Sequence, residues 1–330
     1  MRWAGERRRL SDGQVEQIRL VVRVAQMYHE RGLNQPAIAA QLQISQARVS
    51  RLLKLAQEQG IVRTTVHVPS GIFADIEKEL EDRYGVTQVL VVDTGNSRDE
   101  DVARALAPSA AAYLEGVVGS CPVVGISSWS ETLLAAVEAM HPLRRGVTRD
   151  VVQALGGVGR PGTHSYATRL TEHLAEICRA RPVFLLGPGI VGTPGARRTL
   201  MQDPHFAEVV AYYGRLSMLL TGIGGLATPS RVFRESAAVV SAKDQEDLRA
   251  RGAVGEICLR FFDDQGRLVQ SPLDERVIGL TYEQIKRTPL TVAVAGGGRK
   301  FIAIRAALRG RWVNALITDL ALAERLTREP

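Results

Sequence analysis

Apolar residues near the start of the chain recur three or four positions apart, which is the spacing of one helix face. In the segment 14–31, the apolar residues on that face are Ile18, Val21, Val22, Ala25 and Tyr28. Gly32 follows, and glycine commonly occupies the position just after a helix. The pattern therefore predicts a first helix over residues 14–31.

Two further short helices are predicted directly after the first. Pro36 suits the first turn of the second helix, where its missing N–H costs little. The inner face of that helix consists of Ile38, Ala39 and Leu42. Ser45 is a good N-cap for a third helix that begins at Gln46. The inner face of the third helix follows the i, i+3, i+4, i+7 pattern, with Val49, Leu52, Leu53 and Ala56.

The outer side of the third helix carries polar and cationic side chains. The residues on that side and near its start are Gln46, Ala47, Arg48, Ser50, Arg51 and Lys54. A B-DNA major groove admits one α-helix, arginine pairs with guanine, and glutamine pairs with adenine. Ser50 and Lys54 suit phosphates, and Gln35 in the second helix is a further expected contact. The pattern predicts a helix-turn-helix that binds duplex DNA; the alternative is a merely solvated helix face.

Gln43 is the position that fits this motif least well. The turn between the two helices commonly has glycine there, because glycine adopts a positive φ without strain. If the turn holds Gln43 at positive φ, the cost is on the order of 1 kcal/mol, which the motif tolerates.

The net charge of +7 is concentrated in this same part of the chain. Residues 1–70 contain 11 Lys or Arg and 5 Asp or Glu, whereas the remaining residues contain 31 and 30. Such an asymmetry favours a polyanion-binding head attached to a nearly neutral body. A disordered basic tail is the alternative, but the helical spacing of Leu, Ile and Val argues against it.

Beyond residue 70, apolar and mostly β-branched runs alternate with helical patterns. Helices are predicted at 73–85, at 98–118 with a possible kink at Pro108, and at 130–140. The apolar runs are residues 86–93, 122–126, 151–155, 182–186, 217–223, 256–262, 290–295 and 314–318. Continuous apolar strands that alternate with helices predict an α/β fold with a parallel sheet covered on both faces. We therefore expect two domains, residues 1–70 and 71–330.

The loops after these strands are the expected ligand sites, because open α/β sheets bind ligands at the carboxyl ends of their strands. The sequence SSWSET, residues 127–132, follows one strand and leads into a helix. Its hydroxyl groups and the free N–H groups of the helix start suit an anion or a polyol, unless Ser128 or Ser130 merely caps the helix. Glycines follow three other strands, at Gly156 and Gly157, at Gly222, Gly224 and Gly225, and at Gly296–Gly298.

Residues 296–300, GGGRK, open a further helix. A glycine-rich backbone, a helix start and a lysine together favour phosphate or another anion. Lys300 is one of only five lysines against 37 arginines, a weak hint that an ammonium group matters there.

Several of these segments resemble the SorC family of sugar-binding transcriptional regulators. LNQPAIAAQLQISQARVSRLLKLAQEQGIV, residues 33–62, is similar to the DNA-binding region of that family. Four further motifs follow in the family's order: GISSWSET (125–132), GEICLRFF (255–262), LDERVIG (273–279) and AGGGRK (295–300). The resemblance spans roughly residues 15–327. It implies a doubly wound effector domain similar to sugar-phosphate isomerases, a dimer or tetramer, and a sugar, polyol or sugar-phosphate effector.

The resemblance also implies the residues that hold the effector. The loop from Gly125 to Thr132 would contact ligand oxygens through Ser127, Ser128, Ser130 and Thr132, and Gly296, Gly297 and Lys300 would bind a phosphate or its equivalent. Gly156, Gly157, Gly222 and Gly224 are the expected backbone approaches to the ligand. Asp274 and Arg276 either touch ligand hydroxyls or form an Asp–Arg pair that holds a loop together.

The chain departs from the family pattern at several positions. Asn34 replaces Thr and Gln43 replaces Gly in the head, Ser130 replaces a Gly in the first loop, and Leu259 replaces the Gly of G-R-F-F. Glu131 would repel a phosphate if it pointed inward. A neutral polyol is therefore a better candidate here than in a standard member of the family.

Composition and motifs make other classes of protein poor candidates. No run approaches the roughly 20 apolar residues of a membrane span, and the N-terminus lacks a signal-peptide pattern. Three scattered cysteines suggest reduced thiols and a cytoplasmic location. The six histidines show no metal-ligand spacing. GVGRPG, residues 157–162, fits G-x-G-x-x-G, but Pro161 would interrupt the helix start and no acidic residue follows at the ribose position, so no cofactor is expected.

The sequence thus predicts a DNA-binding transcriptional regulator controlled by a carbohydrate effector and without a catalytic site, as repressor or activator. Trp129 is interpreted as a core residue, with sugar stacking as the alternative. One rival hypothesis is an isomerase- or deaminase-like enzyme with Asp274 as acid/base. A second rival is a protein–protein adaptor that uses the three-helix head.

Overall fold

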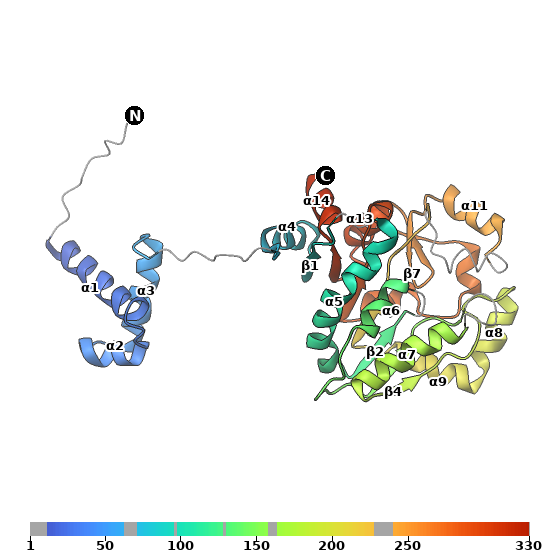
Figure 1. Cartoon of the computed structure of the whole chain (residues 1–330), viewed down its shortest axis with the longest axis horizontal. Coiled ribbons are helices and arrows are strands. Elements are labelled where there is room, and N and C mark those ends of the chain that lie inside the picture. The colour runs from blue at the N-terminus through green and yellow to red at the C-terminus, as the bar shows by residue number, and fades with distance from the viewer. Residues whose placement is uncertain are drawn as a thin grey trace. The chain divides into compact units, whose positions relative to one another are not determined.

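The computed structural model describes residues 12–62, 71–95, 98–127, 130–157, 164–227 and 240–329. The chain divides into two compact units, residues 1–67 and 68–330, which are described one at a time (Figure 1). Among the described residues, no helix combines the length and the apolar character that a membrane crossing requires.

The first unit contains three helices, α1 (Asp12–His29), α2 (Gln35–Leu42) and α3 (Gln46–Glu58). The side chain of Asn34 caps α2 by accepting from the N–H of Ala37 at 3.0 Å, and the Ser45 hydroxyl caps α3 by accepting from the N–H of Arg48 at 3.2 Å. Asparagine caps helices at least as well as threonine, so the departure at Asn34 preserves the function of that position.

The turn between α2 and α3 holds Gln43 in the left-handed conformation. Gln43 adopts φ 55° and ψ 42°, and its N–H and that of Ile44 donate to carbonyl groups at the end of α2. A left-handed residue at a helix end allows these backbone bonds to form. Gln43 thus adopts the positive φ that glycine commonly supplies at this position of the turn.

The core of the first unit confirms the inner faces of α2 and α3 but corrects that of α1. Ile38 and Ala39 of α2 are buried, and so are all four predicted residues of α3. In α1, however, Tyr28 is 39% exposed, and Val24 and Met27 are buried beside the correctly predicted Val21 and Ala25. The helix packs against both α2 and α3, and its buried stripe therefore includes Val24 and Met27. The helix also begins and ends two residues earlier than predicted.

The second unit is built on a parallel sheet with the strand order β1-β11-β10-β5-β2-β3-β4. Its strands are β1 (Gln88–Val92), β2 (Val123–Ile126), β3 (Asp150–Gln153), β4 (Arg181–Val183), β5 (Met218–Thr221), β10 (Leu290–Val294) and β11 (Ala315–Asp319). A smaller antiparallel sheet contains β6 (Gly224–Gly225), β7 (Gly255–Ile257), β8 (Arg260–Phe262) and β9 (Leu268–Val269).

Helices cover both faces of the parallel sheet (Figure 1). One face packs against α5 (Asp99–Val117), α6 (Glu131–Glu138) and α7 (His164–Cys178). The other packs against α4 (Ala74–Tyr84), α9 (Pro204–Tyr213), α12 (Tyr282–Arg287), α13 (Phe301–Arg309) and α14 (Leu320–Arg328). The other helical elements among the described residues are α8 (Pro194–Gln202), α11 (Ala242–Ala250), and the 3₁₀ turns η1 (Val118–Ser120), η3 (Pro272–Arg276) and η4 (Gly298–Lys300). The predicted doubly covered parallel sheet is confirmed.

The run 256–262 is the main error of the strand prediction. It forms the antiparallel hairpin β7–β8 instead of one strand of the parallel sheet. Cys258 and Leu259 take φ values of 51° and 58° and lie between the paired residues Ile257 and Arg260. Two positive φ values are typical of a type I′ turn, which Asn-Gly or Gly-Gly usually signals. Cys258-Leu259 is neither of these pairs, so the apolar run concealed the turn.

At both edge strands of the parallel sheet, local features leave few backbone N–H groups free to pair with another strand. At β1, Glu81 and Glu77 of α4 accept hydrogen bonds from the N–H groups of Val89 and Val91, each at 2.9 Å. At β4, the N–H of Arg181 points toward the β3 side, so Pro182 faces the open edge without an N–H to offer. Exposed strand edges invite pairing with other chains, and these two features oppose it.

Replacing Gln43 by glycine should stabilise the head. Glycine adopts the left-handed conformation without the Cβ penalty, so we expect a gain of roughly 0.5–1 kcal/mol after the greater entropy of the unfolded chain is subtracted. Gln41→Gly is the matched control, because Gln41 is an exposed residue inside α2 and should lose about 1 kcal/mol. Urea unfolding of the full chain, followed by far-UV circular dichroism, measures both. Equal losses in the two variants would contradict the assigned strain.

Candidate functional site

The polar face of α3 is exposed along its whole length. The predicted contacts Gln46, Ala47, Arg48, Ser50, Arg51 and Lys54 are all exposed, and Gln35 is half-buried at the first position of α2. The guanidinium Nε of Arg51 donates to the carbonyl of Ala47 at 3.3 Å, and Lys54 lies 3.8 Å from Glu58. These local contacts orient the cations without removing them from solvent. The arrangement therefore presents one cationic helix face that a major groove can accept.

The loops after β2 and β5 lie next to each other in the second unit. The N–H of Ser127 donates to the carbonyl of Leu220 at 2.9 Å. A Cβ added at Gly222 would lie 2.9 Å from the hydroxyl oxygen of Ser130. That hydroxyl also accepts from the N–H of Leu133 at 3.2 Å, so Ser130 caps α6, as the alternative interpretation held. Ser127 is buried, and Ser128 and Trp129 lie outside the described residues.

The first loop contains three further predicted residues of interest. Gly125 lies inside β2, where a Cβ would come within 2.8 Å of Leu216, so close packing explains this glycine without a ligand. Thr132 is buried in the first turn of α6. Glu131 is exposed, so the structure does not turn its charge inward against an anion.

The β7–β8 hairpin brings three more groups to these loops. Glu256 leaves no room for a Cβ at Gly224, and its Oε2 accepts from the N–H of Leu259 at 2.8 Å. Burial raises the pKa of the Glu256 carboxyl, although the Leu259 N–H and the charge of Lys300 act against this rise. Burial, with a smaller effect of Glu256, also raises the pKa of the Cys258 thiol to about 12, so this thiol is neutral at physiological pH.

The side chains of Ser127 and Thr221 act on the Cys258 thiol and lower its pKa, against the larger effect of burial. We call the following side chains the effector cluster: Ser127, Thr221, Glu256 and Cys258, together with Lys300, whose charge acts on the Glu256 carboxyl. It combines two hydroxyl groups, a carboxyl and an ammonium at the carboxyl ends of β2, β5 and β10. Thr221, Glu256 and Cys258 were not predicted. Glu256 and Cys258 lie within a motif quoted for the resemblance, but only the hidden hairpin turn directs them toward the other loops.

The loop after β10 is fixed by a buried carboxylate. Gly297 has φ 92°, and its N–H donates to Oδ2 of Asp319 at 2.7 Å. A Cβ at Gly296 would lie 2.5 Å from the same oxygen. Lys300 is half-buried at the end of η4, directly before α13. The glycines thus let the loop approach Asp319 closely. The same loop carries Lys300, its contribution to the effector cluster.

Other predicted ligand residues have structural partners elsewhere. Gly156 and Gly157 pack against the backbone of residues 187–189, and the N–H of Gly157 donates to the carbonyl of Gly187 at 2.7 Å. The carboxylate of Asp274 pairs with Arg260 at 2.8 Å. Asp274 and Arg276 therefore do not pair with each other, although each does hold a local structure together. Their contacts with an effector stay predictions.

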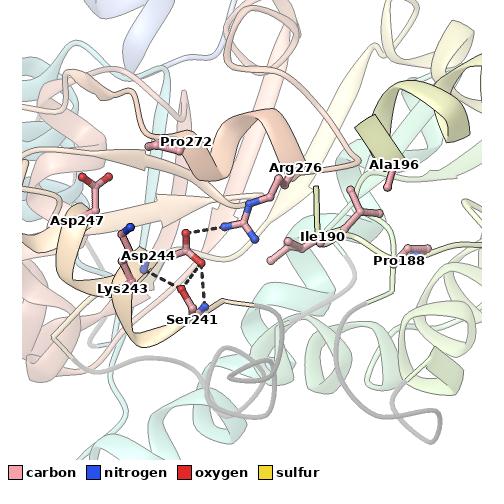
Figure 2. A pocket seen from close by; sticks show the side chains of 11 residues that line it. Pro188, Ile190, Ala196, Ser241, Lys243, Asp244, Asp247, Pro272 and Arg276 are labelled. Carbon is pink, nitrogen blue, oxygen red and sulfur yellow. Dashed lines mark hydrogen bonds and ion pairs between the residues drawn. The ribbon is translucent and has the colours of Figure 1, made fainter. Parts of the chain in front are cut away.

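Arg276 lines a pocket of about 900 Å³ beside α11, which we call the α11 pocket (Figure 2). Its guanidinium lies 2.5 Å from Oδ1 of Asp244, and Ser241 donates to the other oxygen of that carboxylate. Burial opposes the ionisation of Asp244, but the hydrogen bonds from Arg276 and Ser241 outweigh it and lower the pKa. Lys243 and Asp247 also line the pocket, so it contains charges of both signs.

Comparisons with known proteins relate both units to regulators. The model of the Sugar-bind family, which describes a sugar-binding domain, matches residues 71–328. The chain is 28% identical over 319 residues to the sorbitol operon regulator of Klebsiella pneumoniae, which covers 95% of this chain and 99% of that protein. It is 29% identical over 315 residues to the deoxyribonucleoside regulator of Bacillus subtilis, with coverage of 95% and 99%.

Solved structures give the same relationship. The full-length sorbitol operon regulator SorC of Klebsiella pneumoniae superposes with a TM-score of 0.71 at 28% identity, covering 94% of this chain and 98% of that one. A sugar-binding domain of the transcriptional regulator DeoR from Pseudomonas syringae superposes with a TM-score of 0.61 at 31% identity, covering 78% and 100%. The similarity to SorC therefore extends over nearly the whole chain.

Glu256→Gln should stabilise the protein at neutral pH. The folded-state pKa of Glu256 lies above its ordinary value of 4.5. Relative to the variant, the wild-type chain is therefore most stable below pH 4.5. It loses this stability as the pH rises through the folded-state pKa. Glutamine removes this loss, so its unfolding temperature should exceed that of the wild type by a few degrees at neutral pH, and the advantage should vanish at low pH.

Thermal unfolding of both proteins across this pH range provides the measurement. Glu246→Gln is the control, because Glu246 is exposed on α11 and should show no such pH-dependent difference. A Glu256→Gln variant that is less stable at neutral pH would mean that Lys300 and the Leu259 N–H stabilise the carboxylate more than burial destabilises it.

Proposed function

Because the chain belongs to the Sugar-bind family and is a SorC-type transcriptional regulator, we propose that α3 binds operator DNA and that the effector cluster binds a sugar, a polyol or one of their phosphates. The observation that carries this proposal is that the loops after β2 and β5 lie side by side, with Glu256 packed against Gly224, in a domain that the family describes as sugar-binding. Residues 1–70 are the proposed DNA-binding domain and residues 71–330 the proposed effector domain, in a protein of the cytoplasm.

The exposed face of α3 supports the DNA-binding part of the proposal. It offers Arg48, Arg51 and Lys54 for base edges and phosphates, and the capped start of the helix leaves Gln46 in the position where recognition helices meet bases. One such head buries little DNA surface, so specific binding requires two heads on two half-sites. We therefore propose a dimer or tetramer formed by the effector domains.

The chemistry of the effector cluster supports a polyhydroxylated effector. Serine and threonine hydroxyls both donate and accept, a carboxylate accepts from sugar hydroxyls, and an ammonium binds phosphate as a point charge. Burial of Glu256 disfavours negative charge of the effector next to this carboxyl, whereas Lys300 favours negative charge next to its own ammonium group. The proposed effector is therefore a polyol chain at Ser127, Thr221 and Glu256, with any phosphate at Lys300.

The enzymatic alternative finds less support. Asp274, its proposed acid/base, accepts from Arg260 at 2.8 Å and from the N–H of Ser271 at 2.9 Å. Two such bonds hold the carboxylate in place as part of the local structure. The relatives, moreover, are named as transcriptional regulators. We accordingly propose that the chain is not an enzyme.

Arg51→Ala should weaken operator binding by about 1–3 kcal/mol and relax selection at one base pair, because a bidentate contact to a base edge is lost. Arg104→Ala is the matched control: it removes the same charge from an exposed position of the second unit and should leave binding unchanged. Fluorescence anisotropy with operator fragments and single-base variants measures both effects. Unchanged binding by the Arg51 variant would show that the orientation assigned to α3 is wrong.

Lys300→Met should weaken binding of a phosphorylated polyol by about tenfold to a hundredfold, since a hydrogen bond to a charged group is lost. Sorbitol 6-phosphate and sorbitol are suitable first probes, given the names of the relatives, and calorimetry on the full chain measures the affinities. Lys243→Met removes the same charge from the α11 pocket and should have no effect. Loss of affinity in the Lys243 variant alone would move the phosphate site to that pocket.

A further inference from the structure

Asp319 holds two separate segments of the second unit with its two carboxylate oxygens. This residue ends β11 and is 3% exposed. Its Oδ2 accepts from the N–H of Gly297 at 2.7 Å, and its Oδ1 accepts from the N–H of Leu322 at 3.0 Å, which caps α14. The same side chain therefore positions the loop that carries Lys300 and the first turn of the last helix. A buried carboxylate that loses one such partner is costly, so the two segments are tied together.

The far end of α14 is tied to α4 in turn. One guanidinium nitrogen of Arg83 in α4 donates to the carbonyls of Leu326 at 3.2 Å and Glu329 at 3.1 Å. Leu80 of α4 and Leu326 of α14 are fully buried in one apolar cluster. At about 1.5 Å per residue, the nine residues of α14 span on the order of 13 Å between the Asp319 cap and these contacts. A shift at one end of so short a helix reaches the other end.

The position of α4 in the chain makes its connection to Asp319 relevant to the DNA-binding head. It is the first described helix after residue 62, so it is the first described helix of the effector domain that the chain enters after the head. Glu77 and Glu81 of α4 accept from N–H groups of β1, and β1 pairs along its length with β11, the strand that ends at Asp319. One attachment of α4 is thus α14 itself, and the other is the strand that pairs with β11.

We propose that Asp319 is the positioning residue that transmits effector occupancy to the connecting helix. This inference rests on the proposed function of the effector cluster. An effector anion at Lys300 adjoins the 296–300 loop, in which the Gly297 N–H donates to Asp319. Any change in that hydrogen bond alters the cap of α14, and α14 passes the change to α4 through Arg83. The device needs no contact between the effector and α4.

Hydrogen exchange of the full-length protein, followed by mass spectrometry, tests the connection from the 296–300 loop through Asp319 and α14 to α4, without any effector. Asp319→Asn keeps the size of the side chain and its capping ability, but its NH₂ group cannot accept from Gly297. We expect amide exchange in residues 296–300 to accelerate about tenfold, and exchange in residues 74–84 to accelerate with it. Arg83→Ala, a variant of a partly exposed residue, should accelerate exchange in α4 and, in the reverse direction, in residues 296–300.

The double variant separates coupling from simple destabilisation. If both residues act through α14, exchange of α4 in Asp319→Asn/Arg83→Ala should be no faster than in the more affected single variant. Asp203→Asn is the matched control, because it alters another capping aspartate, at α9, and should change exchange only there. Faster exchange confined to residues 296–300 and the first turn of α14, with α4 unaffected, would overturn the inference. If no sugar probe bound, the proposed function would be refuted, but a measured coupling between Asp319 and α4 would remain valid.

Discussion

The parallel sheet of the second unit imposes the constraint on which the other features depend. Its seven strands run in one direction, so all of their carboxyl ends meet at one edge. Because both faces are covered by helices, only that edge and its opposite are accessible to a polar ligand. The effector cluster forms where β2, β5 and β10 end, and Asp319 ends the adjacent strand β11. The positions of Ser127, Thr221, Lys300 and Asp319 follow from this one topological fact, whereas Glu256 and Cys258 reach the same edge from the β7–β8 hairpin.

The same edge concentrates polar groups that a core would exclude. Glu256 is held where burial raises its pKa, Cys258 where burial keeps its thiol neutral, and Asp319 with both oxygens bonded to backbone N–H groups. A buried polar group is tolerated when its hydrogen bonds are satisfied and is costly otherwise. Asp319 is satisfied within the chain and is therefore structural. The carboxyl of Glu256 has one backbone donor and a nearby ammonium, which leaves it the capacity to accept from a ligand.

The sequence allowed the prediction of those parts of the fold that follow from short-range chemistry. Ser45, Pro36 and Gln43 act through neighbours within four residues, so their roles could be read from spacing alone. Continuous apolar runs gave the strands of the parallel sheet for the same reason. Glu256 could not be identified, because its approach to Lys300 requires the hairpin and the sheet order, and neither leaves a local pattern. Gly156 shows the opposite error: its neighbour is the backbone at Pro188, so a glycine that suggested a ligand serves packing.

Leu259 shows how strain and burial are balanced at this site. The family pattern has glycine there, and the positive φ of Leu259 explains why. A leucine in that conformation costs on the order of 1–3 kcal/mol. Burying its side chain among Leu155, Phe261 and Val277 returns about 1.5–3 kcal/mol, which offsets the strain. The turn can therefore keep its shape without glycine. That shape places the Leu259 N–H on Glu256 and the Cys258 thiol beside Ser127, so the substitution alters the packing behind the site while preserving the groups that face the effector.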